Sequence, residues 1–128
     1  MEVIMKKIFV FGSNLAGRHT KGTALRAYKE YGAVYGQGHG LHGNSYAIPF
    51  RDEDFKVLSL NKIQRYVDQF IRFAKLNPDM QFEVTRVGCE VIGYDDKDIA
   101  PMFKDAPKNC QLPVGWRTFK LPSTFFVS

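Results

Sequence analysis

Three short apolar runs along the chain predict β-strands. They lie at 7–11 (KIFVF), 45–50 (SYAIPF) and 82–87 (FEVTRV), and each is rich in β-branched and aromatic residues. The first and third runs end beside a glycine, whereas Pro49 places the end of the second at an edge or an end of the sheet. A further small strand is expected at 111–113.

Between these runs, apolar residues recur at helical spacing. A first helix is predicted over 23–31 and ends at a glycine, and a second is predicted over 60–76 and ends at an Asn-Pro pair. Asn61 and Gln64 have the spacing of a capping box in the second helix. A short third helix is expected with Asp98 as its cap and a proline in its first turn. The apolar sides comprise Ala24, Ala27, Tyr28 and Tyr31 in the first helix and Ile63, Val67, Phe70, Ile71 and Ala74 in the second.

The alternation of strands and helices predicts an α/β fold. We expect three layers, with a mostly parallel central sheet flanked by helices, because crossover helices return the chain to the same edge of a sheet. No linker or repeat interrupts the sequence, so residues 1–128 are expected to form one domain, for which 45% apolar content supplies a core. The glycine-rich segment 36–43 (GQGHGLHG) predicts a hairpin, with a ligand-covering flap as the alternative.

Charge and cysteine content narrow the choice of partner. A net charge of +5 suits an anionic partner such as a nucleotide, but the charges form no basic stripe, so nucleic acid is not the expected partner. Cys89 and Cys110 lack the spacing of a zinc site, and His39 and His42 have no set of carboxylates nearby, so we expect no metal and no cofactor. The N-terminal residues resemble neither a signal peptide nor a membrane span, which predicts a cytoplasmic protein without a membrane partner.

Two glycine-rich loops are expected at the carboxyl ends of the strands, where α/β sheets bind ligands. They lie at 12–23 and 88–95, and their glycines let the backbone approach an anion, although glycine is also ordinary in tight turns between strand and helix. The first loop has the glycine spacing of a P-loop but carries Arg18 and His19 where that motif needs lysine and serine or threonine. A GxGxxG match within 36–43 leads into a strand, so it is not a dinucleotide fingerprint.

The sequences GSNLAGRHTKGTALRAYKEYGA and VGCEVIGYDDKDIAPMF resemble the two ligand loops of macrodomains, the ADP-ribose-binding α/β modules, and especially those of a small bacterial and phage group. The resemblance extends over 7–113 and implies a macrodomain-like fold in which Asn14 lies beside the distal ribose and 88–93 wraps the diphosphate. Thr20 and Glu90 stand where the group has glycines, and the Glu90 charge either faces solvent or lies against the ligand. The binding residues that the resemblance implies are Gly12, Ser13, Asn14, Ala16, Gly17, Lys21, Gly22, Thr23, Gly88, Cys89, Glu90, Val91, Ile92, Gly93 and Tyr94.

The resemblance implies binding of ADP-ribose or a related nucleotide diphosphate ribose through both loops. One alternative is a hydrolase acting on an ADP-ribose ester or ADP-ribose 1″-phosphate in the same pocket, with Asn14 orienting a water or ribose hydroxyl and His19 transferring a proton. Another is a phage or bacterial interaction protein whose pocket is vestigial and whose surface binds RNA or protein. Structural roles also remain open, with Asn14 as a turn residue, His19 as a solvent-facing loop residue and Cys89 as a packed thiol.

Overall fold

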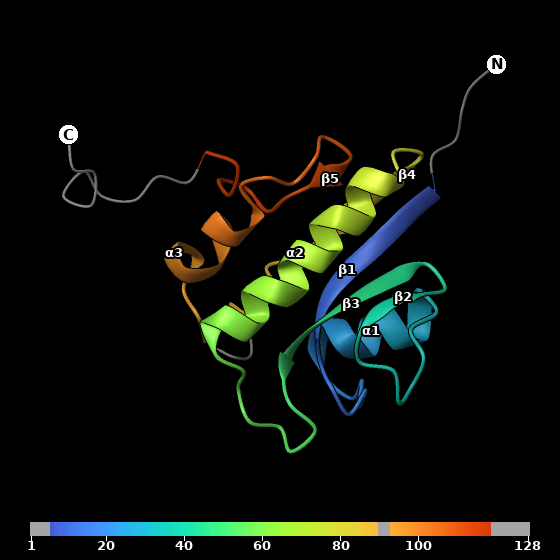
Figure 1. The fold of residues 1–128 in the computed structure, drawn as a ribbon. Helices are drawn as coiled ribbons and strands as arrows, with labels where there is room; N and C mark the ends of the chain where they lie inside the picture. The colour runs from blue at the N-terminus through green and yellow to red at the C-terminus, as the bar shows by residue number, and fades with distance from the viewer. Residues whose placement is uncertain (1–5, 90–92, 119–128) are drawn as a thin grey trace.

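The computed structural model describes residues 6–89 and 93–118 (Figure 1). The strands form one sheet in the order β2-β3-β1-β4-β5. In chain order the elements are β1 (Lys6–Asn14), α1 (Gly22–Glu30), β2 (Gly40–His42), β3 (Ser45–Arg51), α2 (Leu60–Leu76), β4 (Met80–Val84), α3 (Asp96–Ile99), the 3₁₀-helix η1 (Ala100–Phe103) and β5 (Cys110–Gln111).

The sheet is mixed. β1 pairs in parallel with β3 on one side and with β4 on the other, β4 pairs in parallel with β5, and β2 runs antiparallel to β3. The predicted α/β class is therefore confirmed. β2 and β3 form the hairpin predicted for the glycine-rich segment, with Leu41 opposite Tyr46.

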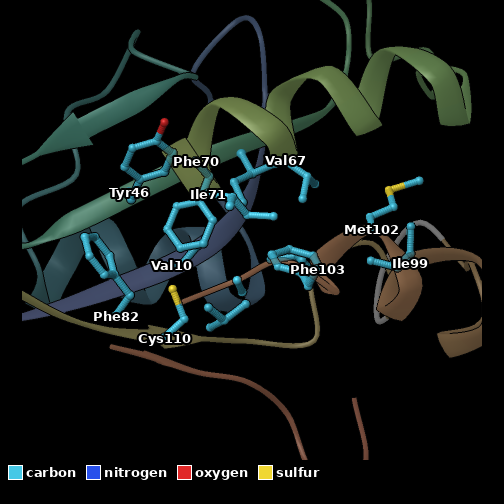
Figure 2. Close-up of a cluster of buried hydrophobic side chains, with 14 of the residues drawn as sticks. Val10, Tyr46, Val67, Phe70, Ile71, Phe82, Ile99, Met102, Phe103 and Cys110 are labelled. Atoms are coloured by element: carbon cyan, nitrogen blue, oxygen red, sulfur yellow. The ribbon is translucent and has the colours of Figure 1, made fainter. Parts of the chain in front are cut away.

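Helices cover both faces of the sheet, and alternate residues of β1 face different helices. Ile8 and Val10 belong to the cluster that packs under α2 and η1, whereas Phe9 and Phe11 belong to a smaller cluster under α1. Phe70 of α2 makes ring contacts with three other aromatic side chains of the larger cluster (Figure 2). Most of the core therefore lies on the α2 side of the sheet.

α2 has the bounds predicted from the sequence. Its N-cap is Ser59, whose hydroxyl accepts a hydrogen bond from the Lys62 amide at 3.3 Å, so the capping box predicted at Asn61 and Gln64 is wrong. The apolar pattern locates the body of the helix, whereas its start depends on one local hydrogen bond. The buried residues of α2 are those predicted, namely Ile63, Val67, Phe70, Ile71 and Ala74.

Within 6–89 and 93–118, neither α2 nor any other helix is long and apolar enough to cross a membrane.

α1 buries less of its surface than its sequence indicates. Ala27 is fully buried against the sheet, and Tyr31, just beyond the helix, stacks on Phe9 with ring centroids 4.4 Å apart. Tyr28 is 47% exposed and meets Tyr35 edge-on, so its assignment to the packed side of the helix is wrong. A helix that approaches a sheet through an alanine leaves little depth for a bulky side chain beside it.

The chain after β4 differs from the prediction in its boundaries. β4 ends at Val84, earlier than predicted, and the Thr85 amide and hydroxyl, just beyond it, both donate to the Val10 carbonyl, at 3.1 and 2.8 Å. α3 begins after Asp95 as its N-cap, and Asp98, the predicted cap, accepts a hydrogen bond from the Asp95 amide at 3.2 Å. The predicted proline lies in η1, and β5 begins one residue before the small strand that the sequence predicts.

Candidate functional site

A cavity of about 430 Å³ opens at the edge of the sheet where β1, β3 and β4 end. Because these strands are parallel, their carboxyl ends meet at one edge, and the register pairs Asn14 of β1 with Arg51 of β3. Small-molecule sites typically have volumes of about 300–1,000 Å³. The described residues that line the cavity are Gly12, Ser13, Asn14, Arg18, Thr20, Lys21, Thr23, Ala24, Arg51, Phe55, Arg86, Val87 and Gly88.

The described lining of the cavity is cationic. It contains Arg18, Lys21, Arg51 and Arg86 and no aspartate or glutamate. Arg86 is ion-paired with Asp96, which lies 3.2 Å away and outside this lining. The other three cations leave an excess of positive charge in the described lining, which favours an anion there.

The N-terminus of α1 opens onto the same cavity. Lys21 is the N-cap, no side-chain hydrogen bond from the described residues caps the helix, and its first turn contains no acidic residue. The Leu25 amide donates to the Lys21 carbonyl at 3.1 Å, so the preceding amides of 22–24 have no acceptor within the helix. Thr23 and Ala24 line the cavity. These amides and the helix dipole favour an anion at this point.

The loop between β1 and α1 is held by the side chain of Asn14. Its Oδ1 accepts a hydrogen bond from the Arg18 amide at 3.0 Å, and its Nδ2 donates to the Arg18 carbonyl at 3.1 Å. The Gly17 amide donates to the Asn14 carbonyl at 2.9 Å. Asn14 therefore lines the cavity and also acts as a turn residue, whose amide group fixes the position of Arg18.

Gly17 brings this loop into contact with the start of the glycine-rich segment 36–43. Its φ is +69°, and a Cβ at this position would lie 2.3 Å from both the Gly36 carbonyl carbon and the Gln37 nitrogen. The Gly36 amide donates to the Gly17 carbonyl at 2.9 Å, which holds the two backbones together. Glycine alone satisfies both the dihedral angle and the close approach.

His19 is buried behind the loop and outside the described cavity lining. Its side chain is 1% exposed, and its Nε2 lies 3.0 Å from the Gln37 carbonyl and 3.1 Å from the Val34 carbonyl. Both partners are acceptors, so Nε2 carries the donated hydrogen. Burial lowers the pKa of His19 below its usual value of 6.5, which keeps the ring neutral at pH 7. The side chain is therefore neither solvent-facing nor part of the cavity wall.

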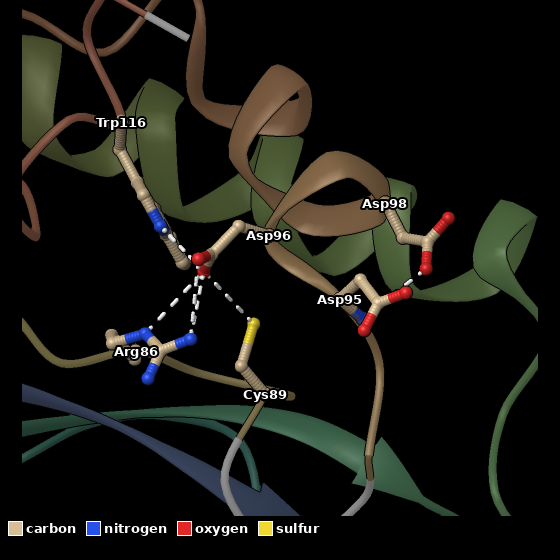
Figure 3. A network of polar contacts seen from close by, with 6 residues as sticks. All are labelled: Arg86, Cys89, Asp95, Asp96, Asp98 and Trp116. Carbon is tan, nitrogen blue, oxygen red and sulfur yellow. Dashed lines mark hydrogen bonds and ion pairs between the residues drawn. The ribbon is translucent and has the colours of Figure 1, made fainter.

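The start of the segment after β4 is held by the carboxylate of Asp96 (Figure 3). Asp96 accepts hydrogen bonds from the Trp116 indole at 3.0 Å, the Arg86 guanidinium at 3.2 Å and the Cys89 thiol at 3.6 Å. The Trp116 hydrogen bond, followed by Arg86, lowers the pKa of Asp96 below its usual range. Burial, together with Asp96, raises the pKa of Cys89 to about 11, so Cys89 is a packed, protonated thiol at neutral pH. The network fixes Arg86 at the cavity wall.

The structure brings together part of the set of residues that the resemblance implies. Gly12, Ser13, Asn14, Lys21, Thr23 and Gly88 line the cavity. Ala16, Gly17, His19, Gly22, Cys89, Gly93 and Tyr94 are not among the described lining residues. The Tyr94 hydroxyl donates to the Leu58 carbonyl at 3.0 Å. Glu90, Val91 and Ile92 lie outside the described residues, and so do both alternatives for the Glu90 charge, facing solvent or lying against the ligand.

Three prominent lining residues were not predicted from the sequence. Arg51 is the last residue of β3, and Arg86 comes two residues after the end of β4. The rule that selected the glycine-rich loops would have indicated Arg51, which directly follows the predicted strand 45–50, but not Arg86, which lies inside the predicted strand 82–87. Phe55 has no comparable signal, because its position depends on the turn that follows β3.

Comparisons of the chain with family models, curated proteins and solved structures give no match. The geometry and charge of the cavity therefore carry the functional argument.

Proposed function

We propose that the cavity binds ADP-ribose or a related nucleotide diphosphate ribose, on a macrodomain-like fold with a mostly parallel sheet. The observation that carries the proposal is the uncapped N-terminus of α1 beside four cationic side chains in one cavity of the described structure. A diphosphate needs such surroundings, because its charges lose water on binding and must be compensated by hydrogen bonds and cations. The resemblance to macrodomain loops supports the nucleotide and ribose parts of the ligand.

In the proposed complex the diphosphate lies over the amides of 22–24, between Lys21 and Arg86. Asp96 already holds Arg86 in position, which lowers the ordering cost of binding. Thr20 and Thr23 supply hydroxyl groups in the lining that can pair with ribose hydroxyls. The ligand is thus recognised chiefly through backbone amides and cations.

We propose binding and not turnover. Hydrolysis needs a proton donor or acceptor within hydrogen-bond reach of the ligand. His19, the residue expected in that role, donates to main-chain carbonyls behind the loop, and the Asn14 amide is engaged with the Arg18 backbone. Neither residue is oriented for the hydrolytic alternative.

Isothermal titration calorimetry with ADP-ribose tests this proposal. We expect saturable binding that weakens as salt is raised, and much weaker binding of adenosine, which lacks the diphosphate. Gly22→Val should abolish ADP-ribose binding in a protein that still folds. Gly22 has a φ of +54° and no heavy atom within 4 Å of an added Cβ, so valine strains the backbone there without a steric clash, between the lining residues Lys21 and Thr23.

Gly40→Val is the matched control for this variant. Gly40 also has a positive φ, +91°, and open space around an added Cβ, but it lies in β2 at the edge of the sheet, and neither of its chain neighbours lines the cavity, whereas both neighbours of Gly22 do. We expect this variant to bind ADP-ribose as the wild type does. Equal affinity for adenosine and ADP-ribose, or unchanged affinity in Gly22→Val, would contradict the proposal.

A further inference from the structure

Phe55 combines backbone strain with an exposed position in the cavity. Its φ of +63° is the single positive value at a non-glycine position among the described residues. For a bulky residue this conformation is an outlier, and such outliers cluster where function requires a fixed side chain. The ring is 37% exposed and lines the cavity, although large apolar side chains are normally buried.

The turn around Phe55 is built to hold this conformation. The Asp52 carboxylate accepts hydrogen bonds from the Asp54 amide at 2.8 Å and the Lys56 amide at 2.9 Å. Arg51 donates from Nη1 to the Phe55 carbonyl at 3.0 Å. These bonds lie on both sides of Phe55 and keep it at its strained φ, so the ring is presented at the cavity by a rigid turn.

A second residue covers the ring. The guanidinium of Arg18 lies over Phe55, 5.3 Å from the ring centroid, in the geometry of a cation–π contact. The backbone of Arg18 is fixed by the Asn14 amide. An aromatic ring and a guanidinium plane are the two protein surfaces on which nucleobases stack.

The described lining of the cavity lacks the carboxylate that could select a base by accepting a hydrogen bond from its exocyclic amine. The Asn14 amide is engaged with the Arg18 backbone, and the Ser13 hydroxyl donates to the Gly38 carbonyl. Base identity is read through hydrogen bonds to base edges, whereas stacking accepts any base because each has a π face.

We propose that Phe55 and Arg18 together form the surface on which the base of the bound nucleotide stacks, so that the cavity recognises the presence of a base and not its identity. This inference rests on the proposed function and makes its ligand class broader, from ADP-ribose to nucleoside diphosphates and their sugar conjugates in general. The diphosphate binds at α1, and the base adds affinity at the Phe55 turn.

Titrations with ADP, GDP, CDP, UDP and inorganic pyrophosphate test the inference. We expect the four nucleotides to bind within about tenfold of one another, each more tightly than pyrophosphate by about fivefold to a hundredfold. Phe55→Ala should remove this nucleotide increment and leave pyrophosphate affinity unchanged. Phe55→Tyr should keep the increment, because the ring remains.

Tyr35→Ala is the matched control, since Tyr35 is an exposed aromatic residue, 54% accessible, outside the cavity lining. It should leave the affinity for all five probes unchanged. Phe55→Leu preserves apolar bulk without the ring and should behave as Phe55→Ala does, which separates stacking from a general loss of packing. Circular dichroism spectra and melting temperatures verify that each variant is folded.

The outcomes separate this inference from the proposed function. If pyrophosphate binds but the nucleotides bind no more tightly, the base inference is overturned while the diphosphate site stands. A preference of more than about a hundredfold for one base, or an unchanged nucleotide increment in Phe55→Ala, also overturns it. If neither pyrophosphate nor any nucleotide binds to the wild type, the proposed function fails and this inference fails with it.

Discussion

The two chain segments at the mouth of the cavity are fixed by different interactions. The loop between β1 and α1 is held by the neutral amide of Asn14 and by the backbone contact of Gly17 with the glycine-rich segment. The segment after β4 is held by the carboxylate of Asp96, which accepts hydrogen bonds from Arg86 and Trp116. The first segment therefore depends on close backbone packing, and the second depends on one charge. Similar glycine-rich sequences are thus stabilised by different physical means.

The largest effect is expected from Gly17→Ala. The new Cβ meets main-chain atoms at 2.3 Å and keeps a φ of +69°, so the loop must move away from the glycine-rich segment. We expect the free energy of unfolding to fall by about 3 kcal/mol, the sum of a strained φ and an overpacked contact. Urea unfolding monitored by circular dichroism measures this loss.

Gly22→Ala is the matched comparison for that prediction. Gly22 has a φ of +54°, but no heavy atom lies within 4 Å of its added Cβ. Only the dihedral cost remains, so the expected loss is about 1 kcal/mol. Equal losses in Gly17→Ala and Gly22→Ala would show that backbone contact does not hold the first loop.

A smaller effect is expected from Trp116→Phe, which alters the charged segment. The phenyl ring keeps the contact with Phe103, where the ring centroids are 5.4 Å apart, but the indole hydrogen bond to Asp96 is lost. We expect the free energy of unfolding to fall, because Asp96 loses a donor and the smaller ring leaves unfilled space where Trp116 is 4% exposed. Urea unfolding measures the loss.

The same variant should also weaken ADP-ribose binding, because Asp96 then holds Arg86 less firmly at the cavity wall. Calorimetry with ADP-ribose detects this change, and Asp96→Asn should shift affinity in the same direction. Full affinity in both variants would show that the Asp96 network stabilises the fold without positioning Arg86.

The smallest effect is a pH dependence from His19. Burial lowers its folded pKa below 6.5, so the unfolded chain takes up a proton at a higher pH than the native protein does. The stability that the neutral ring provides is present above about pH 6.5 and is lost as the pH falls below that value. Melting temperatures of the wild type should therefore decrease between pH 7.5 and 5.5 more steeply than those of His19→Gln. Parallel pH profiles for the two proteins would show that His19 titrates alike in both states.

The hydrophobic pattern was sufficient to predict the α/β class and the main helix. The buried face of α2 follows from helical spacing, and the hairpin follows from the glycines before β3. Boundaries that depend on single residues were not predictable, as at Ser59, whose hydroxyl caps α2, and at Thr85, which lies just beyond β4 and donates from its hydroxyl to the Val10 carbonyl. A periodicity averages over many residues, whereas a cap or a turn depends on one.

The candidate site was predictable in location but not in composition. Strand ends and glycines identified the mouth of the cavity, and the cations near α1 follow from the loop sequence. His19 was assigned a chemical role because histidine titrates near neutral pH, yet it is 1% exposed and donates to main-chain carbonyls. Phe55 was missed because its position depends on a turn with a positive φ, which no residue type in the sequence indicates.

Amide-resolved NMR titration with ADP-ribose tests the central claim most directly, because it reports where the ligand binds. We expect the largest chemical-shift changes at the amides of 22–24, at Gly88 and at Phe55. The amides of Leu41 and Gln69, which line a separate hollow between β2 and α2, should not shift. Shifts concentrated at Leu41 and Gln69, or the absence of any saturable shift at 22–24, would contradict the assignment of this cavity as the nucleotide site.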